Sequence, residues 1–92
     1  MARPEHAIEL VLKTYHHLRV VKTLASSDHP ITKYQISKQS GINSATVAKI
    51  LNELSAHDWT IKTTLKPNKY SLNVGNPVVR KFLEFLEEAK YL

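Results

Sequence analysis

The spacing of apolar residues changes twice along this chain, and these changes constrain the fold more than any other feature of the sequence. Up to about His57, apolar residues recur every three to four positions, as is typical of amphipathic helices. Between Trp59 and Val74 they alternate with polar residues, which indicates two extended strands. From Pro77 onward the helical spacing returns. The pattern predicts an α+β fold that is mainly helical and carries one small β-hairpin.

Capping and breaking residues delimit the expected elements. Pro4 and Pro77 suit a first helical turn, where the missing N–H of proline costs nothing. Thr32 and Asn76 are good N-caps, and Gly41 tolerates the positive φ that often ends a helix. We therefore expect helices over residues 4–25, 33–40, 44–57 and 77–92, the third capped by Asn43 or Ser44, and a hairpin over residues 59–74 that turns at Pro67-Asn68.

The helical pattern also predicts which side of a helix is buried, and the alternating pattern places apolar residues on one side of each strand. The third helix has an apolar stripe with i, i+3, i+4, i+7 spacing, formed by Val47, Ile50, Leu51 and Leu54. Its opposite face is short and polar, with Ser44, Ala45, Thr46, Lys49, Asn52 and Glu53. We expect the helix over residues 33–40 to make its apolar contacts through Tyr34 and Ile36. One side of the first hairpin strand collects Trp59, Ile61, Thr63 and Leu65, and the return strand contributes Tyr70, Leu72 and Val74.

Basic charge is concentrated in the middle of the chain. The 92 residues carry a net charge of +5, with an isoelectric point near 9.6. Residues 32–81 contain eight basic and two acidic residues, a net charge of +6, whereas residues 82–92 have a net charge of −2. A basic cluster of this kind favours an acidic partner such as nucleic acid. A solvated basic surface without a partner is the alternative.

Length and composition limit the possible functions. A chain of 92 residues forms one domain with a modest core, so we treat residues 1–92 as a single domain. The sequence contains no cysteine, which removes disulfides, thiolate metal sites and thiol catalysis and favours an intracellular, cytoplasmic location. The N-terminal segment resembles neither a signal peptide nor a membrane span. We expect no cofactor and no association with membranes.

Titratable side chains are too scattered to predict an active site. The one cluster is His16-His17 with Glu9 or Lys13, but adjacent residues point about 100° apart on a helix, so the two histidines are poorly placed to share a metal ion. Glu9 and Lys13 fit better as an i, i+4 ion pair. The sequence has no nucleophile motif and no phosphate-binding loop. We therefore expect neither an enzyme nor a metal site.

The stretch from Lys33 to Ile50, KYQISKQSGINSATVAKI, resembles a helix-turn-helix motif. Gly41 matches the glycine of the turn, and the apolar positions that pack the two helices together are matched by Ile36, Ile42, Val47 and Ile50. Residues 29–32 resemble the small strand that precedes the motif, and residues 59–74 resemble the wing. The whole chain is thus similar to winged helix-turn-helix transcription regulators of the MarR and ArsR kinds, especially their compact archaeal and archaeal-virus members. Asp58 stands where that family usually has glycine.

The resemblance implies sequence-specific binding of double-stranded DNA, with the helix over residues 44–57 in the major groove. The residues implied in base readout are Asn43, Ser44, Ala45, Thr46, Lys49 and Asn52. Their amide, ammonium and methyl groups suit purine edges and thymine methyls. Contacts to the DNA backbone, in part from the wing, are implied for Lys33, Lys38, Lys62, Lys66, Asn68 and Lys69. For Asn43 and Ser44, a role limited to capping the helix is the alternative.

The resemblance also implies a homodimer formed by the first and last helices, at residues 4–25 and 77–92. Their apolar faces are wider than a small core requires, and excess apolar surface commonly marks association. The implied interface residues are Val11, Tyr15, Leu18, Phe82, Phe85, Leu86 and Ala89. Such a dimer would read two half-sites about one helical turn, ~34 Å, apart. The alternative function is a winged-helix module for protein contacts without sequence-specific DNA readout; the operator, the direction of regulation and any small-molecule effector stay open.

Overall fold

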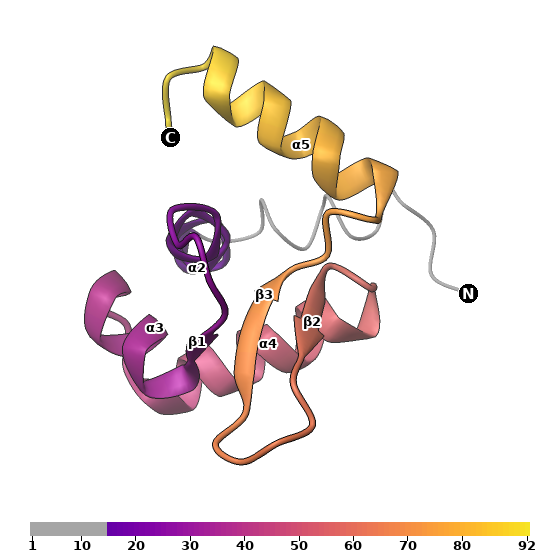
Figure 1. Cartoon of the computed structure of the whole chain (residues 1–92). Helices are drawn as coiled ribbons and strands as arrows, with labels where there is room; N and C mark the ends of the chain where they lie inside the picture. The colour runs from indigo at the N-terminus through magenta and orange to yellow at the C-terminus, as the bar shows by residue number, and fades with distance from the viewer. Residues whose placement is uncertain (1–14) are drawn as a thin grey trace.

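The helices and strands follow one another in the order that the apolar pattern predicts. A computed structural model describes residues 15–92, which form an α+β domain (Figure 1). Its elements are α2 (Tyr15–Ala25), β1 (Ile31–Thr32), α3 (Lys33–Ser40), α4 (Ser44–Ala56), β2 (Thr60–Lys62), β3 (Lys69–Leu72) and α5 (Pro77–Glu88). The expected helix over residues 4–25 is therefore confirmed from Tyr15 onward, and its earlier part lies outside the described residues.

The three strands form one antiparallel sheet in the order β1-β3-β2. The central strand β3 pairs with β1 through Ile31 opposite Tyr70, and with β2 through Thr60 opposite Leu72. Because β1 directly precedes α3, this pairing ties the start of α3 to the hairpin formed by β2 and β3. Figure 1 shows the loop of that hairpin extending beyond the rest of the molecule.

The caps expected from the sequence are present. Thr32 and Gln35 form a capping box, in which the Thr32 Oγ1 accepts from the Gln35 N–H at 3.1 Å and the Gln35 Oε1 accepts from the Thr32 N–H at 2.9 Å. Gly41 ends α3 with a φ of 76°. Asn43, rather than Ser44, caps α4, because its Oδ1 accepts from the Thr46 N–H at 2.9 Å. Asn76 caps α5, and Pro77 occupies its first position.

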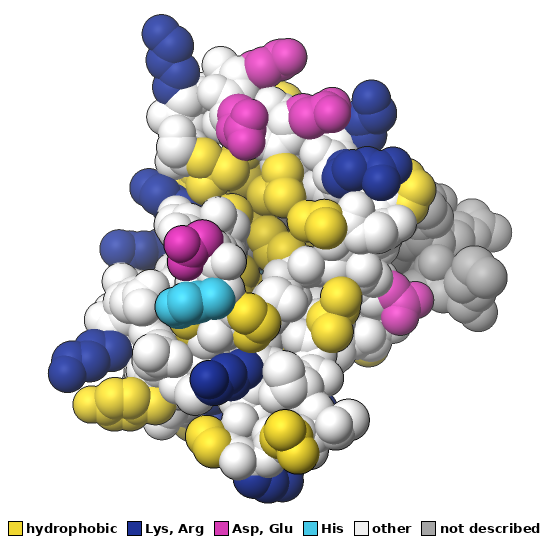
Figure 2. Space-filling model, viewed as in Figure 1, with side chains coloured by type: hydrophobic (Ala, Val, Ile, Leu, Met, Phe, Trp, Pro, Cys, Tyr) yellow, Lys and Arg dark blue, Asp and Glu magenta, His cyan; other side chains and the backbone are white. Residues whose placement is uncertain are grey.

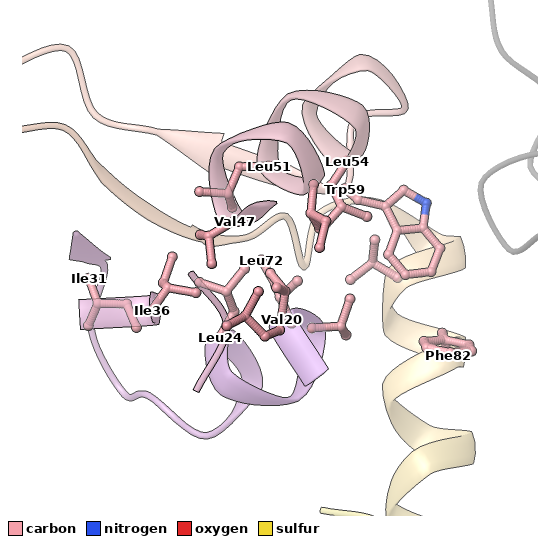
Figure 3. Close-up of a cluster of buried hydrophobic side chains, with 14 of the residues drawn as sticks. Val20, Leu24, Ile31, Ile36, Val47, Leu51, Leu54, Trp59, Leu72 and Phe82 are labelled. Carbon is pink, nitrogen blue, oxygen red and sulfur yellow. The ribbon is translucent and has the colours of Figure 1, made fainter. Parts of the chain in front are cut away.

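The core lies where α2, the inner face of α4 and the sheet meet, with α5 packed over one end (Figure 3). All four residues of the predicted stripe of α4 are buried. Ile36 of α3 is buried in the same core. Trp59 is 1% exposed and packs edge-on against Phe82 of α5, with 5.4 Å between the ring centroids. This aromatic contact anchors α5 to the base of the hairpin.

The structure corrects the pattern predicted for the hairpin. The expected strand over residues 59–66 is regular only from Thr60 to Lys62, with further backbone hydrogen bonds at Trp59 and Thr63, and Ile61 and Leu65 are exposed, Leu65 at 80%. Asp58 has a φ of 60°, and both Trp59 and the following Thr60 are buried, so inward and outward positions shift by one residue. The buried Thr60 hydroxyl lies 2.7 Å from the Ser55 hydroxyl, and this hydrogen bond satisfies both groups.

Two further expectations were wrong. Tyr34 does not contribute to the core, because its side chain is exposed on α3 and lies 5.7 Å, ring centroid to Nζ, from Lys38. The last helix ends at Glu88 rather than at residue 92. Ala89 caps it, and Lys90 then adopts a φ of 59°, which turns the chain out of the helical path.

Candidate nucleic-acid interface

The turn between α3 and α4 sets which face of α4 points outward. Ile42 lies in this turn and is buried, and its backbone is held on both sides by α3. The Ser37 hydroxyl donates to the Ile42 carbonyl at 2.6 Å, and the Ile42 N–H donates to the Ser40 Oγ at 3.3 Å. With the stripe of α4 buried against the core, its opposite face is left to solvent.

The residues expected to read bases lie together on this outward face. Asn43, Ser44, Ala45, Lys49 and Asn52 are exposed, and Thr46 is half-buried. Lys49 and Asn52 make no side-chain hydrogen bond or ion pair with any residue in 15–92, so their polar groups are available to a ligand. Asn43 differs, because its Oδ1 is engaged in capping α4. Its capping role is confirmed, and its base contact stays a prediction.

Glu53 was also expected on the polar face of α4, but its carboxylate is paired with a residue of α2. Its Oε2 lies 2.9 Å from the Nε2 of His17, which is on α2 and only 7% exposed. This contact joins α2 to α4 across 36 positions of sequence. Sequence spacing carries no signal for such a pairing, and the alternatives considered for His17 were Glu9 and Lys13, both outside the described residues. Residues 15–92 hold no cluster of three side chains suited to a metal ion.

Exposed lysines flank α4 on both sides. Lys33 and Lys38 are exposed on α3, and Lys62, Lys66 and Lys69 are exposed along the hairpin. Figure 2 shows dark-blue basic side chains on the lower edge of the molecule, toward α3 and the hairpin, whereas the top, over α5, carries both magenta acidic and dark-blue basic side chains. The acidic residues of α5 are Glu84, Glu87 and Glu88, all exposed. Arg80 and Lys81 are exposed on the same helix, so the surface over α5 is mixed in charge, whereas the exposed charged side chains of α3 and the hairpin strands are lysines.

Asn68 has a role that the sequence did not predict. It was expected to contact DNA, but its amide is used inside the hairpin loop and the residue is half-buried. Its Nδ2 donates to the Thr63 carbonyl at 2.7 Å and its Oδ1 accepts from the Lys66 ammonium at 3.1 Å. A second bond, from the Lys69 N–H to the Thr63 Oγ1 at 2.9 Å, closes the loop. Asn68 therefore positions the lysines of the loop.

The residues expected at a dimer interface divide into two groups. Phe82 and Leu86 are buried in the core of the chain itself, so a partner is not needed to explain their apolar character. Tyr15, Phe85 and Ala89 are exposed, Leu18 is half-buried, and Val11 lies outside the described residues. Phe85 is 60% exposed and borders a shallow hollow of about 420 Å³, whose lining is almost wholly apolar. This hollow is formed by Pro77, Val78, Lys81, Phe82 and Phe85.

Other proteins give no guide to the function of these surfaces. Comparison of the chain with protein-family models, with curated proteins and with solved structures finds no match. No helix within residues 15–92 has both the length and the apolar character required to cross a bilayer.

Proposed function

We propose that this chain is a sequence-specific, double-stranded DNA-binding transcription regulator that has a winged helix-turn-helix fold and acts as a homodimer. One observation carries the proposal: α4 presents an outward polar face with unpaired Lys49 and Asn52, and exposed lysines of α3 and the hairpin flank it. The exposed lysines of α3 and the hairpin give that side of the molecule a surface that attracts phosphate.

The dimensions of α4 suit the major groove. The groove is wide enough for one α-helix, and α4 is a 13-residue helix with short side chains at its N-terminal end. Ser44 and Ala45 would let the helix approach the base edges closely. Lys49, about one turn further on, and Asn52, about two turns further on, would supply hydrogen bonds to purine edges. In this arrangement sequence preference comes from the side chains of α4.

The flanking lysines would bind the phosphates on either side of the groove. Lys33 and Lys38 of α3 would contact one strand, and Lys62, Lys66 and Lys69 of the hairpin would contact the flanking DNA. Phosphate contacts position a protein on the duplex and supply much of its affinity, without reading the sequence. The hydrogen bonds of Asn68 would keep the hairpin loop in the shape that presents Lys66 and Lys69.

A module for protein contacts is the second candidate, because apolar side chains are exposed on the hairpin. Ile61 is 51% exposed and Leu65 is 80% exposed. The two functions differ in their dependence on salt. Binding to DNA releases counterions and weakens steeply as salt rises, whereas an apolar protein contact responds little.

The test is a salt titration of duplex binding, followed by fluorescence anisotropy. The affinity for a random duplex should fall linearly on a double logarithmic plot, and replacing Lys62, Lys66 and Lys69 together by Gln should lower the slope by about 0.9 for each phosphate that the variant no longer neutralises. Lys90→Gln is the control, because Lys90 is an exposed lysine beyond the end of α5 and does not line the hollow beside Phe85. Selection from a random duplex library should return one enriched motif. Absence of binding, or binding that does not respond to salt, would refute the proposal.

A further inference from the structure

We propose that a pocket on α2 is a binding site for an organic phosphate that carries a flat ring, the chemistry of a mononucleotide. The pocket has a volume of about 500 Å³, within the range of small-molecule sites. Its described lining comes from α2, from the C-terminal end of α3 and from the end of the chain. The residues that carry the argument are Tyr15, Arg19, Lys22, Gln39, Ser40 and Tyr91.

The pocket concentrates positive charge. Arg19 and Lys22 are three residues apart on α2, so both side chains lie on the same face of the helix. Neither forms an ion pair with any residue in 15–92, and the described lining contains no acidic side chain. Two cations that share a pocket without a counter-charge repel each other, and an anion bound between them relieves that repulsion.

Both cations lie over tyrosine rings. The Lys22 Nζ is 4.6 Å from the centroid of the Tyr91 ring, and the Arg19 Cζ is 5.9 Å from that of Tyr15. These cation–π contacts limit the freedom of two otherwise flexible side chains, which lowers the entropy lost when a ligand is bound. The planar guanidinium can hold a phosphate through two parallel hydrogen bonds.

Charge and size together select the ligand class. A phosphate monoester carries about −1.5 to −2 charges near pH 7 and so matches two cations better than a single carboxylate does. An inorganic phosphate would fill only a small part of about 500 Å³. A ring attached to the phosphate would fill the remainder beside the tyrosines, where the Gln39 amide makes no hydrogen bond within residues 15–92 and can bind a ring heteroatom.

The position of the pocket suggests that its ligand controls α4. Ser40, in the lining, accepts a hydrogen bond from the Ile42 N–H within the turn that leads into α4. A ligand bound against Gln39 and Ser40 would therefore act on the turn that orients α4. The outward residues of α4 take no part in the lining, so the two sites are separate. This regulatory consequence rests on the proposed DNA-binding function, whereas the ligand site itself does not.

Titration calorimetry with the full chain tests the site directly, with AMP as the probe. AMP should bind, and adenosine and inorganic phosphate should each bind at least about tenfold more weakly, because each lacks half of the recognised chemistry. Arg19→Gln and Lys22→Gln should each weaken AMP binding by about tenfold or more, since each removes a charge-assisted hydrogen bond. Both residues are exposed, so the variants should fold, and Lys81→Gln should bind AMP as the unaltered chain does. No AMP binding, or equal binding by all variants, would overturn the proposal.

Duplex DNA is the second arm of the test, because its backbone is another source of phosphate. If the pocket holds a free nucleotide, the Arg19→Gln/Lys22→Gln chain should keep its affinity for DNA when no AMP is present. It should also lose any effect of AMP on that affinity. Equal losses of DNA and AMP binding in this chain, with AMP competing directly for DNA, would show that the pocket is part of the DNA surface and would refute the free-ligand site. A chain that binds AMP but no DNA would refute the proposed function alone.

Discussion

Residues with a positive φ stand at both ends of α4. Gly41 has a φ of 76° before the helix, and Asp58 has a φ of 60° after it. A left-handed backbone is strained for most side chains but not for glycine, and aspartate tolerates it better than most. The direction in which α4 enters and leaves the core thus depends on two backbone conformations that few residue types adopt at low cost.

Replacing Gly41 by alanine should lower the free energy of unfolding by about 1 kcal/mol, through backbone strain alone. A Cβ at this position would meet no atom within 4 Å, so no steric clash adds to the loss. Gly41→Asn should cost less, because asparagine visits the left-handed region more readily. Urea denaturation of the three chains measures the difference. An alanine variant as stable as the unaltered chain would contradict the assigned conformation.

Substitution of Asn68 tests whether its hydrogen bonds hold the hairpin loop in shape. Asn68→Ala removes the bonds to the Thr63 carbonyl and the Lys66 ammonium, so it should lower stability by about 1 kcal/mol. Asn52→Ala is the matched control: Asn52 is exposed and makes no side-chain hydrogen bond within residues 15–92, so its loss should change stability by less than about 0.5 kcal/mol. Thermal unfolding of both variants measures the two losses of stability. Equal stabilities would show that the bonds of Asn68 do not hold the loop.

At the scale of elements, local signals predicted more of the fold than the alternation of side chains did. The caps at Thr32 and Asn76 and the turn at Gly41 were predicted because each depends on a few neighbouring residues. The inward and outward sides of the first hairpin strand were not, because burial of both Trp59 and Thr60 depends on how the preceding turn meets the core. The contact between α2 and α4 through Glu53 joins distant segments and leaves no local pattern.

In the candidate site, too, features that depend on neighbouring residues could be predicted, and features that depend on the folded chain could not. Its lysines and the outward face of α4 could be predicted, since amphipathic spacing alone determines which side of a helix is polar. The structural use of Asn68 could not, because the carbonyl that it binds is set by the folded loop. The sequence likewise could not predict that the Lys49 and Asn52 side chains make no hydrogen bond or ion pair within residues 15–92, because this depends on where all their neighbours lie.

Base readout by α4 predicts different effects for substitutions on different elements. Asn52→Ala and Lys49→Ala should each reduce the preference for the selected site over a random duplex by about 1–3 kcal/mol. Lys69→Ala, on β3, should weaken all duplexes alike and lower the salt slope by about 0.9. Competition binding with both duplexes at several salt concentrations measures the two quantities. If all three variants lose the same affinity on every duplex, α4 does not read bases.

At the scale of the whole molecule, the lysines proposed to bind DNA and the exposed Phe85 lie on different elements. The lysines are exposed on α3 and the hairpin, whereas Phe85 is exposed on α5 together with acidic residues. Residues 15–92 extend 30 Å along their longest principal axis, less than the ~34 Å between half-sites on successive turns of DNA. A single chain would therefore cover one half-site, and association through α5 would leave the basic side of each protomer open to DNA.

The homodimer makes a specific prediction for Phe85. In sedimentation equilibrium the unaltered chain should have twice the 10.5 kDa mass of one protomer, whereas Phe85→Glu should sediment as a single protomer, because a buried, unpaired carboxylate at an apolar interface is strongly unfavourable. Leu65→Glu is the matched control: Leu65 is even more exposed, but it lies on the hairpin, so this variant should remain a dimer. The Phe85→Glu protomer should retain weak, salt-dependent binding to a single half-site and lose the added affinity for a paired one, since linking two half-site contacts raises overall affinity without any new contact. An unaltered chain that sediments at 10.5 kDa at micromolar concentration would exclude the dimer and leave the reading of one half-site as the function of the isolated chain.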